Sequence, residues 1–288
     1  MIARGVRYTS RGMHRLIISA PFGNYIQPPG CTATLGTFTA QRRPGRVWRI
    51  IRTVRYYPRL GAWVNKIGLR NPGMDWLVAR TAAGLIDPSD KIVSIHGFTE
   101  DEWRTLLDKA AALRPAPIAI ELNMSCPNIG HVNWPAWLFA RAAELRNPSP
   151  QSQVPGPFCI IKLPPVNYRD MFDQAIDAGI RAFHCCNTIP IPAGGVSGKP
   201  LKPVSLACIA DIRSRAPAHI LPRLTIIGGG GITTPADIDD YAAAGATHFA
   251  IATKVFNPKY LWSHAALQPL IHRANSAAPP PSPVGKES

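Results

Sequence analysis

The stretch Ile226-Ile-Gly-Gly-Gly-Gly-Ile232 places four consecutive glycines directly after an apolar run. The apolar run is typical of a buried strand. A helix start follows at Thr234-Pro235, because threonine caps helices well and proline suits their first position. These residues predict one strand–turn–helix unit, and the fold depends on where this unit stands among others like it.

Short apolar runs alternate with helix-forming segments on both sides of this stretch. We expect strands at 16–20, 31–39, 62–69, 92–96, 118–124, 158–163, 182–187, 224–228 and 248–253. We expect helices at 100–113, 136–146, 168–178, 204–216, 235–244 and 259–275. The alternation predicts an α/β fold with a parallel sheet made of βα units.

The late position of the glycine-rich turn favours a (β/α)8 TIM barrel. A doubly wound open sheet, the alternative, usually carries its glycine-rich phosphate loop after the first strand. A barrel needs eight strands, so one of the expected runs is surplus, and we assign 62–69 to an arm beside the active site. The 288 residues suit a single α/β barrel domain, which we expect to span 1–275. The proline-rich tail, 276–288, is expected to be disordered.

The composition indicates a basic globular protein. Apolar residues make up 46% of the chain and charged residues 17%, which supplies a sizeable core. Lys and Arg number 32 against 17 Asp and Glu, a net charge of +15 that suits nucleic acid, phosphate cofactors or carboxylate substrates. Arginines are densest in 42–59, where tyrosines interleave, so a nucleic-acid or acidic-lipid patch is conceivable. We favour a solvated arginine-rich loop inserted over one barrel end, with no nucleic acid bound.

Cysteine spacing and hydropathy exclude several classes of protein. The six cysteines form no CxxC or CxxH pair, which argues against zinc, iron–sulfur and disulfide sites within this chain. No apolar run reaches the roughly 18 residues that a membrane span requires. The apolar run at 16–20 is too short for the core of a signal peptide. We therefore expect a cytoplasmic protein with no bound metal and no membrane span.

Two neighbouring strand ends predict a phosphate site. Glycines 230 and 231 lack Cβ atoms, so backbone N–H groups can approach an anion near a helix N-terminus. The next expected strand ends at Ala252-Thr253, which adds a hydroxyl at the adjoining corner. Either feature alone could be an ordinary tight turn, but in this order they match the phosphate site of the last two βα loops of many barrels.

Other polar residues fall at the ends of expected strands. Lys162 ends an apolar strand, where a buried ammonium needs an anion or a strong acceptor, although an exposed lysine at a strand end is equally common. Five asparagines stand at equivalent positions: Asn65, Asn71, Asn123, Asn128 and Asn187. Single asparagines are usually turn residues, but a converging set suits a flat ligand with alternating N–H and C=O groups.

Cys126 lies in Glu121-Leu-Asn-Met-Ser-Cys-Pro-Asn128, just past an expected strand end. A thiolate there can act as a general base if it is accessible and stabilised. The alternative is a small buried residue filling a turn. A turn before proline is an unusual place for core packing, so the general base is favoured.

Taken in order, several segments resemble the FMN-dependent dihydroorotate dehydrogenases of the soluble, cysteine-base class. The segments are NKIGLRNPG (65–73), ELNMSCPN (121–128), IKLPP (161–165), CNT (186–188), GGVSGKPL (194–201), IIGGGGI (226–232) and AT (252–253). The resemblance implies an FMN-binding barrel that oxidises (S)-dihydroorotate to orotate in de novo pyrimidine biosynthesis. It also implies a homodimer and a possible iron–sulfur electron-transfer subunit as partner.

The resemblance assigns a role to each matching residue. Cys126 would remove the C5 proton while a hydride leaves C6 for the flavin. Substrate contacts would come from Asn65, Gly68, Leu69, Asn123, Asn128, Asn187 and Thr188. Flavin contacts would come from Ser19, Ala20, Lys162, Gly198, Gly230, Gly231, Ala252 and Thr253.

The chain departs from the family pattern at Gly36, within Thr34-Leu-Gly-Thr-Phe-Thr39, where the family has a lysine. The departure removes a positive charge from the expected rim, which Lys66 or an arginine of 42–59 could replace. It leaves two alternatives open: an FMN oxidoreductase acting on another dihydropyrimidine or an enone, and a non-catalytic flavin- or phosphate-binding subunit.

Overall fold

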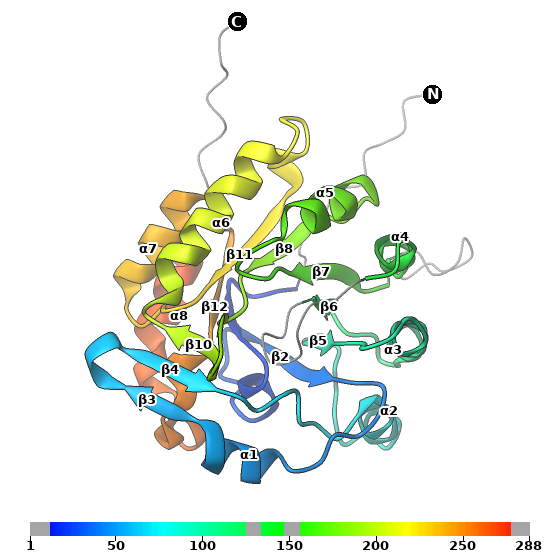
Figure 1. Ribbon diagram of the computed structural model, residues 1–288, viewed down its shortest axis with the longest axis horizontal. Coiled ribbons are helices and arrows are strands. Elements are labelled where there is room, and N and C mark those ends of the chain that lie inside the picture. Colours follow the sequence, from blue (N-terminus) through cyan, green and yellow to red (C-terminus); the bar gives the residue numbers. More distant parts are fainter. Residues whose placement is uncertain (1–11, 125–133, 147–155, 278–288) are drawn as a thin grey trace, which may run out of the picture.

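A computed structural model of the chain describes residues 12–124, 134–146 and 156–277. Eight parallel strands close into a barrel in the order β1-β12-β11-β8-β7-β6-β5-β2, which confirms the predicted TIM barrel (Figure 1). The barrel strands are β1 Leu16–Ile18, β2 Cys31–Phe38, β5 Ile92–Ile95, β6 Ala119–Asn123, β7 Phe158–Lys162, β8 Ala182–Cys185, β11 Thr225–Gly229 and β12 His248–Ile251. The expected tail, 276–288, falls almost wholly outside the described residues.

The outer helices follow the barrel strands. They are α2 Met74–Ala82, α3 Glu100–Ala112, α4 Leu138–Glu144, α5 Arg169–Asp177, α6 Leu201–Arg215, α7 Pro235–Ala244 and α8 Gln268–Ser276. The start signal of α7 is confirmed: Thr234 and Asp237 form a capping box, and Pro235 occupies the first turn. Within the described residues, no helix is long and apolar enough to cross a bilayer.

Two apolar clusters build the core. The larger cluster fills the space between the barrel and the helices. The smaller one fills the barrel interior and includes Ile17, Ile92, Ile160, Ile227 and Ala250. Each buried isoleucine contributes about 1.5–3 kcal/mol of transfer free energy. Part of the barrel interior is therefore filled by a tightly packed apolar layer, and the polar residues inside the barrel lie on the side of this layer nearer the carboxyl ends of the strands.

A second sheet stands beside the barrel and contains the surplus run. Its order is β3-β4-β10-β9, and its strands pair antiparallel. The strands are β3 Arg55–Tyr57, β4 Ala62–Asn65, β9 Ile189–Ile191 and β10 Gly194–Gly198. The assignment of 62–69 to an arm outside the barrel is therefore confirmed in its strand part, β4.

Two expectations about local structure were wrong. The arginine-rich segment is not a loop, because it contains helix α1 Arg46–Thr53 and strand β3. Residues 259–275 do not form one helix, because Pro269 would clash with the preceding turn inside it; in the structure Pro269 lies in the first turn of α8. Short 3-10 helices occupy the irregular parts: η1 Phe22–Asn24, η2 Pro58–Leu60, η3 Leu221–Arg223, η4 Thr253–Phe256, η5 Pro258–Leu261 and η6 Ala265–Leu267.

Candidate functional site

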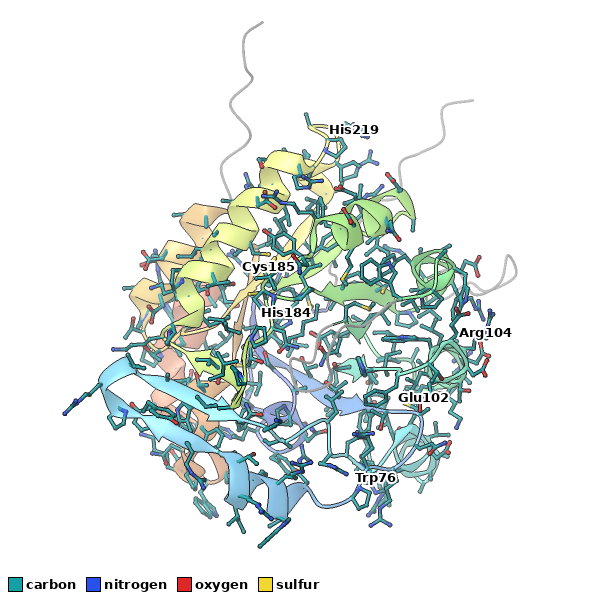
Figure 2. All side chains as sticks on the ribbon, in the orientation of Figure 1. Trp76, Glu102, Arg104, His184, Cys185 and His219 are labelled. Atoms are coloured by element: carbon teal, nitrogen blue, oxygen red, sulfur yellow. The ribbon has the colours of Figure 1, made fainter. Side chains whose placement is uncertain are left out.

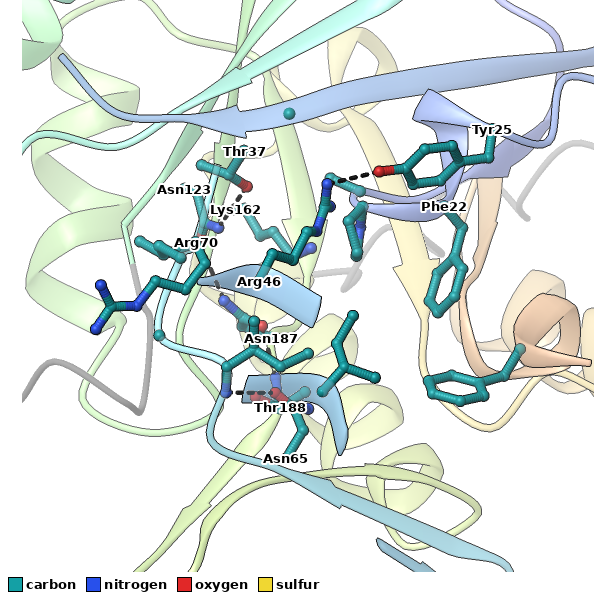
Figure 3. Close-up of a pocket in the computed structure, with 18 of the residues that line it drawn as sticks. Phe22, Tyr25, Thr37, Arg46, Asn65, Arg70, Asn123, Lys162, Asn187 and Thr188 are labelled. Carbon is teal, nitrogen blue, oxygen red and sulfur yellow. Dashed lines mark hydrogen bonds between the residues drawn. The ribbon is translucent and has the colours of Figure 1, made fainter. Parts of the chain in front are cut away.

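Two adjoining cavities lie at the carboxyl ends of the barrel strands. The larger, of about 410 Å³, is called the open cavity and is lined by residues of η1, β2, α1, β4 and the ends of β6, β7 and β8 (Figure 3). The smaller, of about 90 Å³, is called the glycine cavity and is lined by the ends of β1, β11 and β12 and by β10. Lys162 lines both cavities, so the two form one continuous site.

Apart from Asn71, the structure brings together every predicted site residue that it describes. The open cavity holds Asn65, Gly68, Leu69 and Asn123. Both cavities share Ala20, Lys162, Asn187 and Thr188. The glycine cavity holds Ser19, Gly198, Gly230, Gly231, Ala252 and Thr253. Cys126 and Asn128 lie outside the described residues.

Asn71 does not belong with the other asparagines. It is buried, accepts hydrogen bonds from the backbone N–H groups of Thr39 and Gly73, and donates to the carbonyl of Leu69 at 2.7 Å. It does not line either cavity. The strand-end pattern was therefore wrong for this residue, whose side chain stabilises a turn.

A buried carboxylate lies beneath the site. In the barrel register, Lys162 is opposite Asn123 on one side and His184 on the other. Alternate residues of a strand point to the same face, so Glu121 lies one layer below Asn123 inside the barrel. Its carboxylate accepts hydrogen bonds from Ser94 Oγ at 2.7 Å and from His184 Nδ1 at 2.8 Å. Figure 2 shows His184 near the middle of the barrel, whereas Glu102 and Arg104 project from α3 on the outside.

Charge in this buried layer is balanced. Burial alone would raise the pKa of Glu121, but the positive charge of Lys162 and the hydrogen bonds from His184 and Ser94 outweigh it and lower the pKa to about 2. Burial and the charge of Lys162 lower the pKa of His184. The imidazole is therefore neutral near pH 7, although it is close enough to Glu121 for an ion pair. The negative charge of Glu121 thus offsets the positive charge of Lys162, although the described residues include no direct ion pair between the two.

A chain of hydrogen bonds fixes the amides of the open cavity (Figure 3). Thr37 Oγ1 lies 3.0 Å from Ser94 Oγ and accepts a hydrogen bond from Asn123 Nδ2 at 3.1 Å. Asn187 Nδ2 donates to Asn123 Oδ1 at 3.0 Å, and the Thr188 N–H donates to Asn187 Oδ1 at 2.8 Å. Because each amide has a defined partner, the amide orientations are set before a ligand arrives.

The glycine cavity accepts only glycine at its turn. Gly230 has φ +117°, and a Cβ there would lie 2.6 Å from Leu201 Cγ. Gly231 has φ +72°, and a Cβ there would lie 3.0 Å from the carbonyl oxygen of Gly198. Tyr241 Oη donates to the carbonyl of Gly230 at 2.8 Å and anchors the turn. This backbone cradle, followed closely by the N-terminus of α7, suits an anionic group such as a phosphate.

Gly36 lines the open cavity and has no room for a side chain. Its φ is +103°, and a Cβ would lie 2.5 Å from the carbonyl oxygen of Ser94 and 2.8 Å from the backbone nitrogen of Phe38. Arg46 and Arg70 line the same cavity and supply positive charge that a residue at position 36 cannot. Arg46 Nη1 donates to Tyr25 Oη at 2.7 Å.

Sequence reasoning missed several residues of the site. Glu121 and Thr37 stand in quoted stretches of sequence that give them no role, and no sequence motif draws attention to His184. Their inward direction could have been inferred from strand alternation, but their contacts require the register between strands. Arg46 was counted within the arginine-rich segment, and only its helical setting directs it to the cavity.

Comparison with known proteins identifies the family. The sequence model of the family described as dihydroorotate dehydrogenase matches residues 27–273. The chain belongs to the dihydroorotate dehydrogenase family. It is therefore an oxidoreductase of the dihydroorotate dehydrogenase type, a family of pyrimidine biosynthesis.

Curated relatives agree with this assignment, and a solved structure agrees with the fold. The catalytic subunit of dihydroorotate dehydrogenase B (NAD(+)) from Latilactobacillus sakei is 30% identical over 73% of this chain and 76% of its own length. Dihydroorotate dehydrogenase A (fumarate) from Lactiplantibacillus plantarum is 28% identical over 82% of this chain and 85% of its own. A crystal structure of the DHODH of Eimeria tenella in complex with ferulenol superposes with a TM-score of 0.71 at 17% identity, over 97% of this chain and 90% of that chain, and supports the fold.

Proposed function

We propose that this dihydroorotate dehydrogenase family member binds FMN and oxidises (S)-dihydroorotate to orotate, with Cys126 as the general base. One observation carries the proposal. Lys162, whose charge the buried Glu121 offsets, lies beside the fixed amides of Asn123 and Asn187, and the same site continues into the glycine cavity.

The residues of the site fit FMN. Gly230 and Gly231 form a cradle that any Cβ would fill, and Thr253 adds a hydroxyl, so this end suits the flavin phosphate. Lys162 and Ala20 line both cavities and suit the ring. No described residue accepts a hydrogen bond from the Lys162 ammonium, which is therefore available to a ligand acceptor. When bound, FMN supplies a two-electron acceptor for the hydride that leaves C6 of the substrate.

The open cavity suits a dihydropyrimidine. The substrate ring alternates N–H and C=O groups, and the amides of Asn65, Asn123 and Asn187 can pair with both kinds. Arg46 and Arg70 supply the positive charge that the substrate carboxylate needs. These arginines take the place of the lysine that the family pattern has where this chain has Gly36.

Cys126 completes the proposed chemistry. It follows Asn123, the last residue of β6, by three positions. In the proposed step the C5 proton passes to the Cys126 thiolate while the hydride leaves C6, so the substrate loses two electrons and two hydrogens. Cys126→Ser should therefore slow reduction of the flavin more than it weakens orotate binding. Cys31→Ser is the matched control, because Cys31 lies at the opposite end of β2 and should leave both unchanged. Equal rates in wild type and Cys126→Ser would remove Cys126 from the mechanism.

The function is tested on purified protein under anaerobic conditions. A visible flavin absorbance band should be present and should bleach when dihydroorotate is added. A bound flavin that stays oxidised would exclude dihydroorotate and leave the second candidate, a related oxidoreductase acting on another dihydropyrimidine or an enone, which the closed space at Gly36 favours. Protein without flavin would support a non-catalytic role.

The electron acceptor and the partners are part of the same proposal. The relatives include proteins named for NAD(+), called catalytic subunits, and one named for fumarate. For this chain we propose a homodimer that passes electrons to fumarate, to a quinone, or to NAD(+) through an iron–sulfur subunit. Reoxidation of the reduced protein by fumarate alone supports the first route, reoxidation by a quinone alone supports the second, and reoxidation by NAD(+) only with an added electron-transfer subunit supports the third. Light scattering measures the mass of the assembly.

A further inference from the structure

Helix α1 leaves much of its apolar side exposed at the rim of the open cavity. At 3.6 residues per turn, Val47, Trp48, Ile50 and Ile51 share one side, and Arg46, Arg49 and Thr53 share the other. Arg52 lies at the boundary, over the Trp48 ring at 5.9 Å. A surface helix of a globular protein normally packs its apolar side on the core. In α1 no residue is buried, and Val47, Trp48 and Ile51 are 70%, 61% and 65% exposed. The amphipathic pattern is thus inverted: Val47 and Ile50 border the open cavity, and Trp48 and Ile51 stay largely exposed.

The polar side of α1 holds this orientation. Arg46 donates to Tyr25 Oη and lies over the Tyr25 ring at 5.5 Å. Thr53 Oγ1 accepts a hydrogen bond from the backbone N–H of Lys66 at 3.1 Å, just beyond β4. The fold therefore presents the apolar side outward through specific contacts. Figure 1 shows α1 at the edge of the molecule, outside the ring of helices around the barrel.

Positive charge surrounds this apolar side. The first 74 residues contain no Asp or Glu, and the first acidic residue is Asp75. Three exposed arginines, Arg52, Arg55 and Arg59, lie in α1, β3 and η2, and the exposed Tyr56 and Tyr57 stand between the last two. We define the α1 surface as Val47, Trp48, Ile51, Arg52, Arg55 and Arg59. It combines exposed apolar side chains with a single sign of charge.

We propose that the α1 surface docks on an anionic lipid bilayer. Arginines beside Trp and aliphatic residues are typical of helices that lie in the membrane interface. Each arginine near an anionic bilayer strengthens binding roughly fivefold. A second copy of the chain would oppose one set of arginines with another, which disfavours a symmetric contact. Nucleic acid would neutralise the arginines but leave Val47 and Ile51 uncovered.

Docking in this way sets the position of the site. Arg46, Val47 and Ile50 also line the open cavity, so one helix carries both the cavity wall and the α1 surface. The mouth of the site would then lie at the bilayer surface. This docking differs from a membrane span, because it uses a short internal helix in the interfacial plane.

Sedimentation with lipid vesicles tests the proposal. The intact protein is mixed with vesicles of phosphatidylcholine alone or of equal parts phosphatidylcholine and phosphatidylglycerol, at low and at physiological salt. We expect binding to the anionic vesicles that weakens with added salt. We expect Trp48→Ala and Ile51→Ser each to weaken it about tenfold, the scale of one apolar side chain, and Arg52→Gln or Arg55→Gln to weaken it about fivefold.

Matched controls come from exposed residues outside α1, β3 and η2. Leu85 is 62% exposed and Arg104 is exposed on α3, so Leu85→Ser and Arg104→Gln remove the same kinds of group and should leave vesicle binding unchanged. Unchanged urea midpoints show that all variants fold. Absence of binding to anionic vesicles overturns the proposal, as does an equal loss in the control variants. A concentration-dependent dimer that Ile51→Ser dissociates would also overturn it, since a second copy would then cover the surface.

Discussion

Replacing Gly36 with lysine should destabilise the barrel and should not restore the positive charge of the family pattern. The obstacle lies in the backbone, because the nearest atoms to a Cβ at this position are the Ser94 carbonyl oxygen at 2.5 Å and the Phe38 nitrogen at 2.8 Å. No rotation of a side chain relieves such contacts. Gly36 is also held on both sides by Asn24, which accepts from its N–H at 3.0 Å and donates to its carbonyl at 2.9 Å.

The magnitude follows from two contributions, which are the same for alanine and lysine because both begin at Cβ. A non-glycine residue at a positive φ of this kind is strained by about 1–3 kcal/mol. Overpacking against fixed atoms adds about 1–3 kcal/mol. Gly36→Ala should therefore lower the free energy of unfolding by about 2–6 kcal/mol, a large part of the roughly 5–15 kcal/mol typical of a domain.

Urea unfolding of matched variants separates the two contributions. Gly179 also has a positive φ, +90°, but a Cβ there would meet nothing within 4 Å. Gly179→Ala should lose about 1–2 kcal/mol from backbone strain alone, and Gly36→Ala should lose distinctly more. Equal losses would show that the contacts at Gly36 relax without cost. A Gly36→Lys protein as stable as wild type would refute the reasoning altogether.

Three further predictions concern the buried layer, the phosphate end and a helix cap. Glu121→Gln should lower the free energy of unfolding by about 3–5 kcal/mol at pH 7, because it removes the buried charge that offsets Lys162, whereas Glu144→Gln on the surface should change it by less than about 0.5 kcal/mol. The pKa of Glu121 in the folded protein lies below its usual value of 4.5. The stability that this carboxylate contributes is therefore complete above pH 4.5 and is lost as the pH falls toward 2. The urea midpoints of wild type and Glu121→Gln should converge over the same pH range. Gly230→Ala should weaken FMN retention about tenfold in ultrafiltration, since its Cβ would meet Leu201. Thr234→Ala removes the N-terminal cap of α7 and should lower the free energy of unfolding by about 1 kcal/mol, measured by calorimetry.

The late βα units were predictable because their signals are local. The pattern of apolar residues, the glycines at a strand end and the helix cap at Thr234-Pro235 each depend on residues close together in the sequence. The order of the resulting βα units along the chain then predicted the barrel. The prediction of one helix over 259–275 was wrong because it considered only the apolar residues and not Pro269, which lies in the first turn of α8. Helix α1 was not predicted because its apolar residues alternate with arginines, so the segment does not look like one that packs on a core. In the structure those apolar residues are indeed exposed.

The site was predictable only in part, for a physical reason. Parallel strands of a barrel end on one rim, so residues such as Lys162 and Asn187 could be placed together from sequence order. The pairing of Glu121 with His184 depends on the register across β6, β7 and β8, which no local pattern encodes. The closed space at Gly36 likewise depends on Ser94, which is far away in the sequence.

The sheet beside the barrel joins the two ends of the site mechanically. In its β4–β10 pair, Asn65 is opposite Gly195 and Ala62 is opposite Gly198. One end of this ribbon belongs to the open cavity and the other to the glycine cavity. We expect a ligand that orders one end to order the other as well, so that the second ligand meets less residual motion. Linkage then requires symmetry: a phosphate group bound in the glycine cavity should tighten orotate binding by the same factor by which bound orotate tightens the binding of that phosphate group.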